Sequence, residues 1–320
     1  MIEMQDVSFA YRTTFSGEGR EDDLGRAKDG RGGGSGKDDG GGRGGVRGLS
    51  LRIARGECVL LCGASGCGKT TVARLVNGLI PHFFEGKLAG TVCVDGMDSQ
   101  ETEIAAFSDA VGTVFQNPRT QFFNADVDSE IVFGLENRGI ARAQLCARLD
   151  DVTEELHLQA LRGRSVFELS GGEKQKVAFS SVYASDPDVL VFDEPSSNLD
   201  MKSIEELAKL MRTAKEKGKT ILVAEHRIWY LMDIVDRVIY LQDGVIVSDM
   251  PIEDFRKLSE RDMRSRGLRS RDLAALQPEA TVRSSASGNI LSLENLSVRL
   301  SGNEVLKSIS FQANAGEIVA

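Results

Sequence analysis

The side chains best suited to chemistry gather around a glycine-rich bend in the first quarter of the chain. The spacing G-x-x-x-x-G-K-[ST], and one further threonine, are supplied by Gly63, Ala64, Ser65, Gly66, Cys67, Gly68, Lys69, Thr70 and Thr71. Glycines let successive backbone N–H groups face phosphate oxygens, Lys69 can reach the outer phosphates of a nucleotide, and the Thr70 hydroxyl can ligate magnesium. An apolar run precedes the bend and a helical pattern follows it, as the motif requires. These residues predict a phosphate-binding loop rather than a chance glycine turn beside a solvated lysine.

A pair of carboxylates ends the apolar run "VLVFDEP", residues 189–195. In an open α/β sheet, ligands bind at the carboxyl ends of the strands. Asp193 could hold magnesium directly or through water, and Glu194 could orient or deprotonate an attacking water. Without the phosphate-binding loop, a strand that simply ends in a polar turn would be the preferred interpretation. With the loop, the pair predicts phosphoryl transfer to water.

A third motif, "LSGGEKQ", occupies residues 169–175. Its candidate binding residues are Ser170, Gly171, Gly172, Glu173 and Gln175. A hydroxyl and backbone N–H groups at the start of a helix can form a second anion site. An ordinary helix cap explains the serine and the glycines individually, but it does not explain the whole string in front of the carboxylate-bearing strand.

These motifs, together with "SSNLD" at residues 196–200 and His226, occur in the order typical of ATP-binding cassette (ABC) ATPases, which the chain resembles. The resemblance implies an α/β fold of the P-loop NTPase class, ABC type. Such a fold has a mainly parallel sheet core, an antiparallel β subdomain and a helical subdomain. It also implies ATP and Mg²⁺ as the bound species, and ATP hydrolysis coupled to transport as the activity.

Carried over residue by residue, the resemblance assigns further roles. Tyr11 would stack on adenine, Gln116 would sense magnesium and the attacking water, and His226 would contact the terminal phosphate. Glu194, His226 and Gln116 form the expected catalytic set, whereas Thr70, Gln116 and Asp193 form the expected metal set. Asp200 would communicate between paired domains, and the "LSGGEKQ" residues would serve a nucleotide held by the partner. Taken singly, Tyr11 could be a strand aromatic, Gln116 a loop residue and His226 a satisfied core histidine.

The elements that must position these residues follow from hydrophobic periodicity. Apolar or alternating runs predict strands within 2–11, 49–62, 188–195 and 219–226, and residues 128–161 read as mainly helical. A stripe at helical spacing is expected to face the core: Ile204, Leu207, Ala208, Met211 and Ala214. Strand, helix and strand in this order indicate an α/β domain.

The domain organisation includes an internal repeat. Residues 291–300 match residues 2–11, and residues 306–320 match residues 46–60. We therefore expect a first ABC ATPase domain over 1–250, with a helical subdomain at about 118–165. A helical tail and linker over 251–288 would lead to a second, truncated ABC domain at 289–320. The glycine- and charge-rich segment 16–48 is predicted to be a disordered insertion, because it has almost no apolar side chain to bury.

Composition limits the remaining function classes. With 41% hydrophobic residues, the 320-residue chain can bury a sizeable core, and its net charge of −9 weighs against broad nucleic-acid binding. The start lacks the pattern of a secretion signal, and the five cysteines lack the spacing of a zinc site. These features favour a reducing, cytoplasmic location.

Two longer stretches, 115–137 and 224–244, resemble energy-coupling-factor importers for vitamins or transition metals, particularly forms with two cassettes on one chain. This resemblance implies transmembrane importer subunits and a second ABC ATPase domain as partners, at the cytoplasmic face of the cell membrane. It does not specify the transported substrate. Two alternatives remain open: a soluble tandem ATPase that acts on ribosomes or DNA, and a regulatory nucleotide-binding module.

Overall fold

The computed structural model describes residues 2–12, 45–273, 289–300 and 302–315. Most of the predicted insertion, and residues 274–288 of the predicted tail and linker, lie outside the described residues. The chain divides into two compact units, Met1–Leu273 and Ala274–Ala320.

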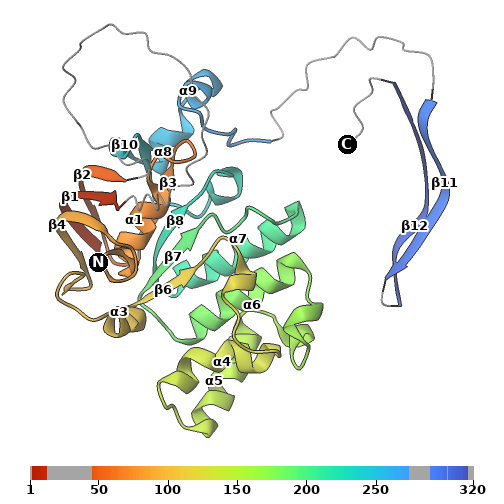
Figure 1. Ribbon diagram of the computed structural model, residues 1–320, viewed down its shortest axis with the longest axis horizontal. Helices are drawn as coiled ribbons and strands as arrows, with labels where there is room; N and C mark the ends of the chain where they lie inside the picture. The colour runs from red at the N-terminus through yellow and green to blue at the C-terminus, as the bar shows by residue number, and fades with distance from the viewer. Residues whose placement is uncertain (1, 13–44, 274–288, 301, 316–320) are drawn as a thin grey trace, which may run out of the picture. The chain divides into compact units, whose positions relative to one another are not determined.

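A six-stranded sheet forms the centre of unit 1 (Figure 1). In pairing order its strands are β10 (Val245–Pro251), β9 (Arg237–Gln242), β3 (Cys58–Cys62), β8 (Thr220–Ala224), β7 (Val189–Asp193) and β6 (Val111–Val114). All neighbours pair in parallel except β10 and β9. Every residue of β3 is buried, because alternate side chains enter hydrophobic cores on opposite faces of the sheet. Strands covered on both faces read as continuous apolar runs.

Unit 1 also contains a four-stranded antiparallel sheet. Its strands pair in the order β2 (Val46–Ile53), β1 (Ile2–Tyr11), β4 (Gly86–Val94) and β5 (Met97–Asp98). The apolar run 49–62 is therefore divided between two sheets, with a turn at 54–57 in which Gly56 has φ 75°. The expected insertion boundary at residue 48 was wrong, since β2 already begins at Val46, whose buried side chain joins the core.

Helices cover both faces of the central sheet. Helix α1 (Lys69–Val76) packs with the antiparallel sheet in one core, beside the short helices α2 (Leu79–His82) and α3 (Ile104–Ala110). Helices α6 (Gly171–Ala184) and α7 (Met201–Glu216) belong to the other core. The predicted core-facing stripe of α7 is buried in full. Short 3-10 turns complete this part: η1 (Pro118–Thr120), η2 (Gln159–Leu161), η3 (Val166–Glu168) and η4 (Trp229–Leu231).

The region expected to be helical contains α4 (Val127–Asn137) and α5 (Arg142–Glu155), which lie beside α6 (Figure 1). The predicted division of the chain at residue 250 differs from the observed one. Helices α8 (Ile252–Arg256) and α9 (Glu260–Ser265) belong to unit 1, because Phe255 and Met263 are buried in its core. The tail is therefore part of the first domain rather than of a linker.

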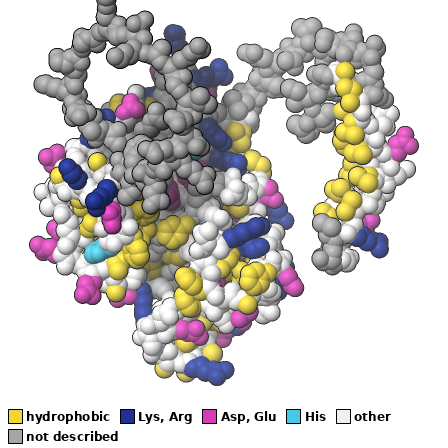
Figure 2. Space-filling model, viewed as in Figure 1, with side chains coloured by type: hydrophobic (Ala, Val, Ile, Leu, Met, Phe, Trp, Pro, Cys, Tyr) yellow, Lys and Arg dark blue, Asp and Glu magenta, His cyan; other side chains and the backbone are white. Residues whose placement is uncertain are grey.

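Unit 2 contains a two-stranded antiparallel ribbon, β11 (Asn289–Leu300) and β12 (Asn303–Asn314). Hydrophobic side chains form a row along it in Figure 2. Several of them are well exposed, among them Leu291, Leu296, Leu306, Ile309 and Phe311.

Candidate nucleotide site

The glycine-rich bend joins β3 to α1, and its backbone needs glycine. Gly63 has φ 149°, and a Cβ there would lie 2.2 Å from the carbonyl oxygen of Leu241. Gly66, by contrast, has φ 79° and open space on its side-chain side. The first glycine thus lets the loop pass close to β9, and the second leaves room beside the loop for a ligand.

Lys69 opens α1 and is only 3% exposed. Its ammonium donates hydrogen bonds to the carbonyl oxygens of Gly63 and Ala64, each at 3.1 Å, and lies 3.8 Å from Cys67 Sγ. The loop therefore wraps around a buried positive charge. Beside it lies a cavity of about 280 Å³, lined by Tyr11, Ser65, Gly66, Gly68, Lys69, Thr70, Thr71, Arg74 and Glu194. Of the predicted loop residues, Cys67 is buried and does not face this cavity.

Two residues of the predicted metal set, Thr70 and Asp193, lie in contact, whereas the third, Gln116, contacts Glu194. Thr70 Oγ1 donates to Asp193 Oδ1 at 3.0 Å, across the sheet end between α1 and β7. Burial raises the pKa of Asp193, and the hydrogen bond from Thr70 opposes that rise. A hydroxyl and a carboxylate are the oxygen ligands that Mg²⁺ prefers, so these two residues fit the ion and would hold it. Bound there, magnesium would neutralise charge on the phosphates of a nucleotide.

Glu194 stands at the centre of the expected catalytic set. Gln116 Nε2 donates to Glu194 Oε2 at 3.4 Å, and His226 Nε2 lies 3.1 Å from Glu194 Oε1. The Glu194 backbone is left-handed, with φ 48°, and its N–H donates to the carbonyl of Ala224. Such strained conformations concentrate at functional sites. Burial and then the nearby Lys69 ammonium lower the pKa of His226, which favours the neutral imidazole at pH 7.

One buried acid beside the site was missed by the sequence analysis. Glu225, 2% exposed, accepts hydrogen bonds from the backbone N–H groups of His226, Arg227 and Ser196, and from the hydroxyl of Tyr230. It ties the loop after β7, which follows Glu194, to the loop after β8, which carries His226. We call Glu225 with these four donors the loop clamp. Its position next to His226 at a strand end was the one signal in the sequence.

The "LSGGEKQ" residues lie elsewhere in unit 1, at the start of α6. Ser170 is the N-cap, and its side chain and that of Glu173 exchange hydrogen bonds with each other's backbone N–H groups. Gly172 packs so closely on α7 that a Cβ would lie 2.1 Å from Ser203 Oγ. Gln175 does not join this surface, because its side chain is 2% exposed.

Asp200 starts the neighbouring helix α7. It is the N-cap residue, and its carboxylate accepts a hydrogen bond from the Ser203 backbone N–H at 2.7 Å. That hydrogen bond lowers the pKa of Asp200. The same residue, Ser203, lies against Gly172, so Asp200 and the start of α6 share one surface of the unit. This surface contributes no residue to the lining of the cavity beside the phosphate-binding loop.

The described residues include no helix with the length and apolar character needed to cross a bilayer.

The comparisons with known proteins agree with this geometry. Residues 46–197 match the ABC transporter family. An ABC transporter ATP-binding protein of Treponema denticola is 57% identical over 277 residues, which cover 85% of this chain and 57% of that protein. The chain thus spans little more than half the length of this relative.

Two solved structures share the fold. One is cbiO1 of Clostridium perfringens, part of the ABC transporter complex cbiONQ. Its TM-score is 0.64 and its identity 23%, over 82% of this chain and 93% of that one. The other is a dimeric ATP-binding cassette bound to ADP and phosphate in a post-hydrolysis state. Its TM-score is 0.60 and its identity 22%, over 79% of this chain and 99% of that one. The predicted fold class, a P-loop NTPase of the ABC type, is confirmed.

Proposed function

Because this chain contains an ATPase domain of the ABC transporter family, we propose that it binds and hydrolyses ATP to power a membrane importer. The observation that carries the proposal is the cavity beside the phosphate-binding loop, with Glu194 on its wall. The importer is proposed to be of the energy-coupling-factor type, for vitamins or transition metals. The sequence resemblance at 115–137 and 224–244 supports that finer assignment.

In this proposal each residue has a defined task. Main-chain N–H groups of the loop and Lys69 grip the triphosphate, while Thr70 and Asp193 hold magnesium. Glu194 orients or deprotonates the attacking water, and Gln116 and His226 keep its carboxylate in place from either side. A neutral His226 can donate one hydrogen bond to the terminal phosphate or to Glu194. Positioning and charge stabilisation would supply most of the rate enhancement.

The test is a conservative change at the carboxylate. Glu194→Gln should leave ATP binding intact but lower steady-state hydrolysis at least 100-fold, because the amide cannot accept a proton. Glu205→Gln, an exposed change on α7, is the matched control and should hydrolyse at the wild-type rate. Unchanged turnover in Glu194→Gln would refute the role of this residue.

We propose that hydrolysis also requires a second cassette, whose nucleotide would be contacted by Ser170, Gly171 and Gly172. The support is that these residues lie at the start of α6, with Ser170 and Gly171 exposed, and do not line the cavity beside the loop of their own unit. The rate per molecule should therefore rise with protein concentration, or when a second cassette is added. A full rate in a dilute monomeric preparation would contradict this.

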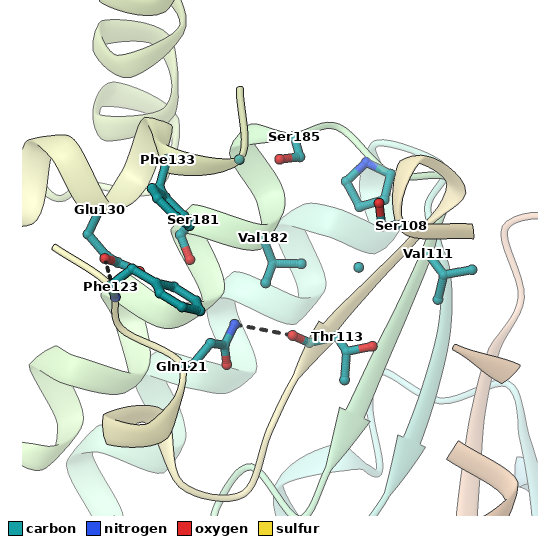
Figure 3. A pocket seen from close by; sticks show the side chains of 13 residues that line it. Ser108, Val111, Thr113, Gln121, Phe123, Glu130, Phe133, Ser181, Val182 and Ser185 are labelled. Carbon is teal, nitrogen blue, oxygen red and sulfur yellow. Dashed lines mark hydrogen bonds between the residues drawn. The ribbon is translucent and has the colours of Figure 1, made fainter. Parts of the chain in front are cut away.

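The membrane partner is proposed to dock beside the segment that follows Gln116. A pocket there is lined by residues of α3, β6, α4 and α6, and Figure 3 shows the rings of Phe123 and Phe133 side by side at its edge. The two rings stack at 4.9 Å, and Phe123 is 74% exposed. Glu130 fixes this segment by accepting the backbone N–H groups of Phe123 and Asn124. An exposed aromatic over a pocket suits an apolar side chain of a partner helix.

Docking can be tested by co-purification with membrane subunits. Phe123→Ser should reduce the recovered complex while ATP affinity stays within 2-fold. Phe83→Ser, which removes a 68%-exposed ring elsewhere on unit 1, is the matched control. Equal recovery with both variants would place the partner on another surface.

We also propose that residues 289–314 begin a second cassette. The support is the register of the ribbon: Leu291 pairs with Ala313 as Ile2 pairs with Ile53, and the later pairs follow the same irregular steps. The left-handed residue Asp6, φ 49°, corresponds to Asn295, also φ 49°.

A further inference from the structure

A cluster that joins Tyr11 to helix α1 forms part of the wall of the same cavity. Tyr11, the last residue of β1, places its hydroxyl 3.2 Å from Thr71 Oγ1, and Arg74 Nη1 donates to that hydroxyl at 3.0 Å. All three residues line the cavity beside the loop. Thr71 and Arg74 stand three positions apart on α1, so they share one face of the helix that begins at Lys69.

The aromatic neighbours of Tyr11 restrict its ring further. Phe9 meets it edge to face at 4.8 Å, and Phe84 meets it edge to face at 6.1 Å. The Arg74 guanidinium carbon lies 4.0 Å from the centroid of the Phe84 ring. The Arg74 guanidinium therefore makes two contacts at once. Its edge donates a hydrogen bond to the Tyr11 hydroxyl, and its carbon lies over the Phe84 ring. Lysine cannot make this combination, because an ammonium has no plane.

We propose that Arg74 is a positioning residue for the base of the nucleotide: it fixes the Tyr11 ring on which adenine stacks. This inference rests on the proposed ATP-binding function. Helix α1 then carries residues that position both ends of the nucleotide. Lys69 and Thr70 act on the triphosphate, and Arg74 acts on the base through Tyr11.

A different role for Arg74 makes a different prediction. Its positive charge also acts on the half-buried Asp193, where it opposes the rise in the pKa of that carboxyl. If this charge were its main contribution to binding, its loss would weaken any triphosphate, with or without a base. A positioning role through Tyr11 weakens only ligands that carry the base.

Isothermal titration calorimetry on the 320-residue chain separates the two roles. The ligands are ATP and inorganic tripolyphosphate, each with Mg²⁺. The variants are Tyr11→Phe, which keeps the ring but removes the hydroxyl, Arg74→Met, and the two combined. Arg12→Met is the matched control, since Arg12 forms an ion pair with Glu85 in which both side chains are more than 70% exposed.

We expect each single variant to weaken ATP about 2- to 10-fold, the effect of one lost hydrogen bond. The double variant should be no weaker than Tyr11→Phe alone, because both changes break the same contact. Tripolyphosphate affinity should stay within 2-fold throughout, and Arg12→Met should match the wild type for both ligands.

Three results would overturn the inference while leaving the proposed function intact. The first is ATP affinity unchanged in Arg74→Met. The second is an equal loss for ATP and tripolyphosphate, and the third is losses that multiply in the double variant. A wild-type chain that bound neither ligand would overturn the proposed function, and this inference with it.

Discussion

The ribbons β1–β2 and β11–β12 share a strand register and a left-handed residue in the first strand, but their side chains differ in burial. In each, a serine hydroxyl accepts the N–H of the left-handed residue of the first strand: Ser50 for Asp6 at 3.0 Å, and Ser310 for Asn295 at 2.8 Å. The local sequence is therefore enough to specify strands, bulges and register. The turn residues and the alternation of apolar side chains carry that information.

The surroundings differ in burial. Leu49 in the first ribbon is 1% exposed, and its equivalent in the second, Ile309, is 39% exposed. The first ribbon packs against α1, which carries Lys69, and this packing belongs to the core that supports the phosphate-binding loop. A ribbon alone supplies no phosphate site, so in the described residues the nucleotide chemistry belongs to unit 1.

The largest expected effect comes from the same change made in both ribbons. Leu49→Ser should lower the free energy of unfolding of unit 1 by about 3 kcal/mol, through a cavity and a buried hydroxyl. Ile309→Ser should change it by less than about 0.5 kcal/mol. Urea unfolding followed by the fluorescence of Trp229, the single tryptophan, reports on unit 1. Similar losses at both positions would show that the second ribbon is not independent of unit 1.

Sequence reasoning could propose a site where its residues are neighbours in the chain. Residues 63–70 follow β3 and run into the start of α1, and Asp193 and Glu194 lie together at the end of β7, so each motif could be recognised within a single stretch. It failed where a role depends on a neighbouring strand: Glu225 binds Ser196 only because β7 and β8 are adjacent. Gln175 was predicted to be a binding residue because it belongs to the "LSGGEKQ" motif. The motif does not reveal that its position on α6 faces the core, where the residue is buried.

A second variant weakens the loop clamp, which belongs to unit 1 and has no counterpart among the described residues of the second ribbon. Glu225→Gln replaces one carboxylate oxygen of the loop clamp by an amide N–H₂ group. That group cannot accept hydrogen bonds from the backbone N–H groups that face it. ATP hydrolysis should fall about 10-fold while ATP affinity changes less than 2-fold, because the clamp aligns Glu194 with His226. Glu216→Gln, an exposed change on α7, is the control. A fall in affinity equal to the fall in rate would assign the clamp a general structural role.

The smallest expected effect concerns pH and is again confined to unit 1. Burial lowers the pKa of folded His226, so near pH 6.5 the unfolded chain takes up a proton that the folded chain does not. This histidine's contribution is therefore fully present above pH 6.5 and is lost as the pH falls below it, by at most about 1.4 kcal/mol per pH unit. His226→Gln should lose less stability than the wild type between pH 7.5 and pH 5.5, as measured by urea unfolding. An equal loss in both would contradict the assignment.

The central claim is that one triphosphate binds in this chain, at the loop around Lys69. The most direct test is calorimetric titration of the chain and of Lys69→Ala with ATP and Mg²⁺. We predict one site per wild-type chain and at least a 100-fold weaker affinity in the variant. Undiminished affinity in Lys69→Ala, or two equal sites in the wild type, would contradict the account.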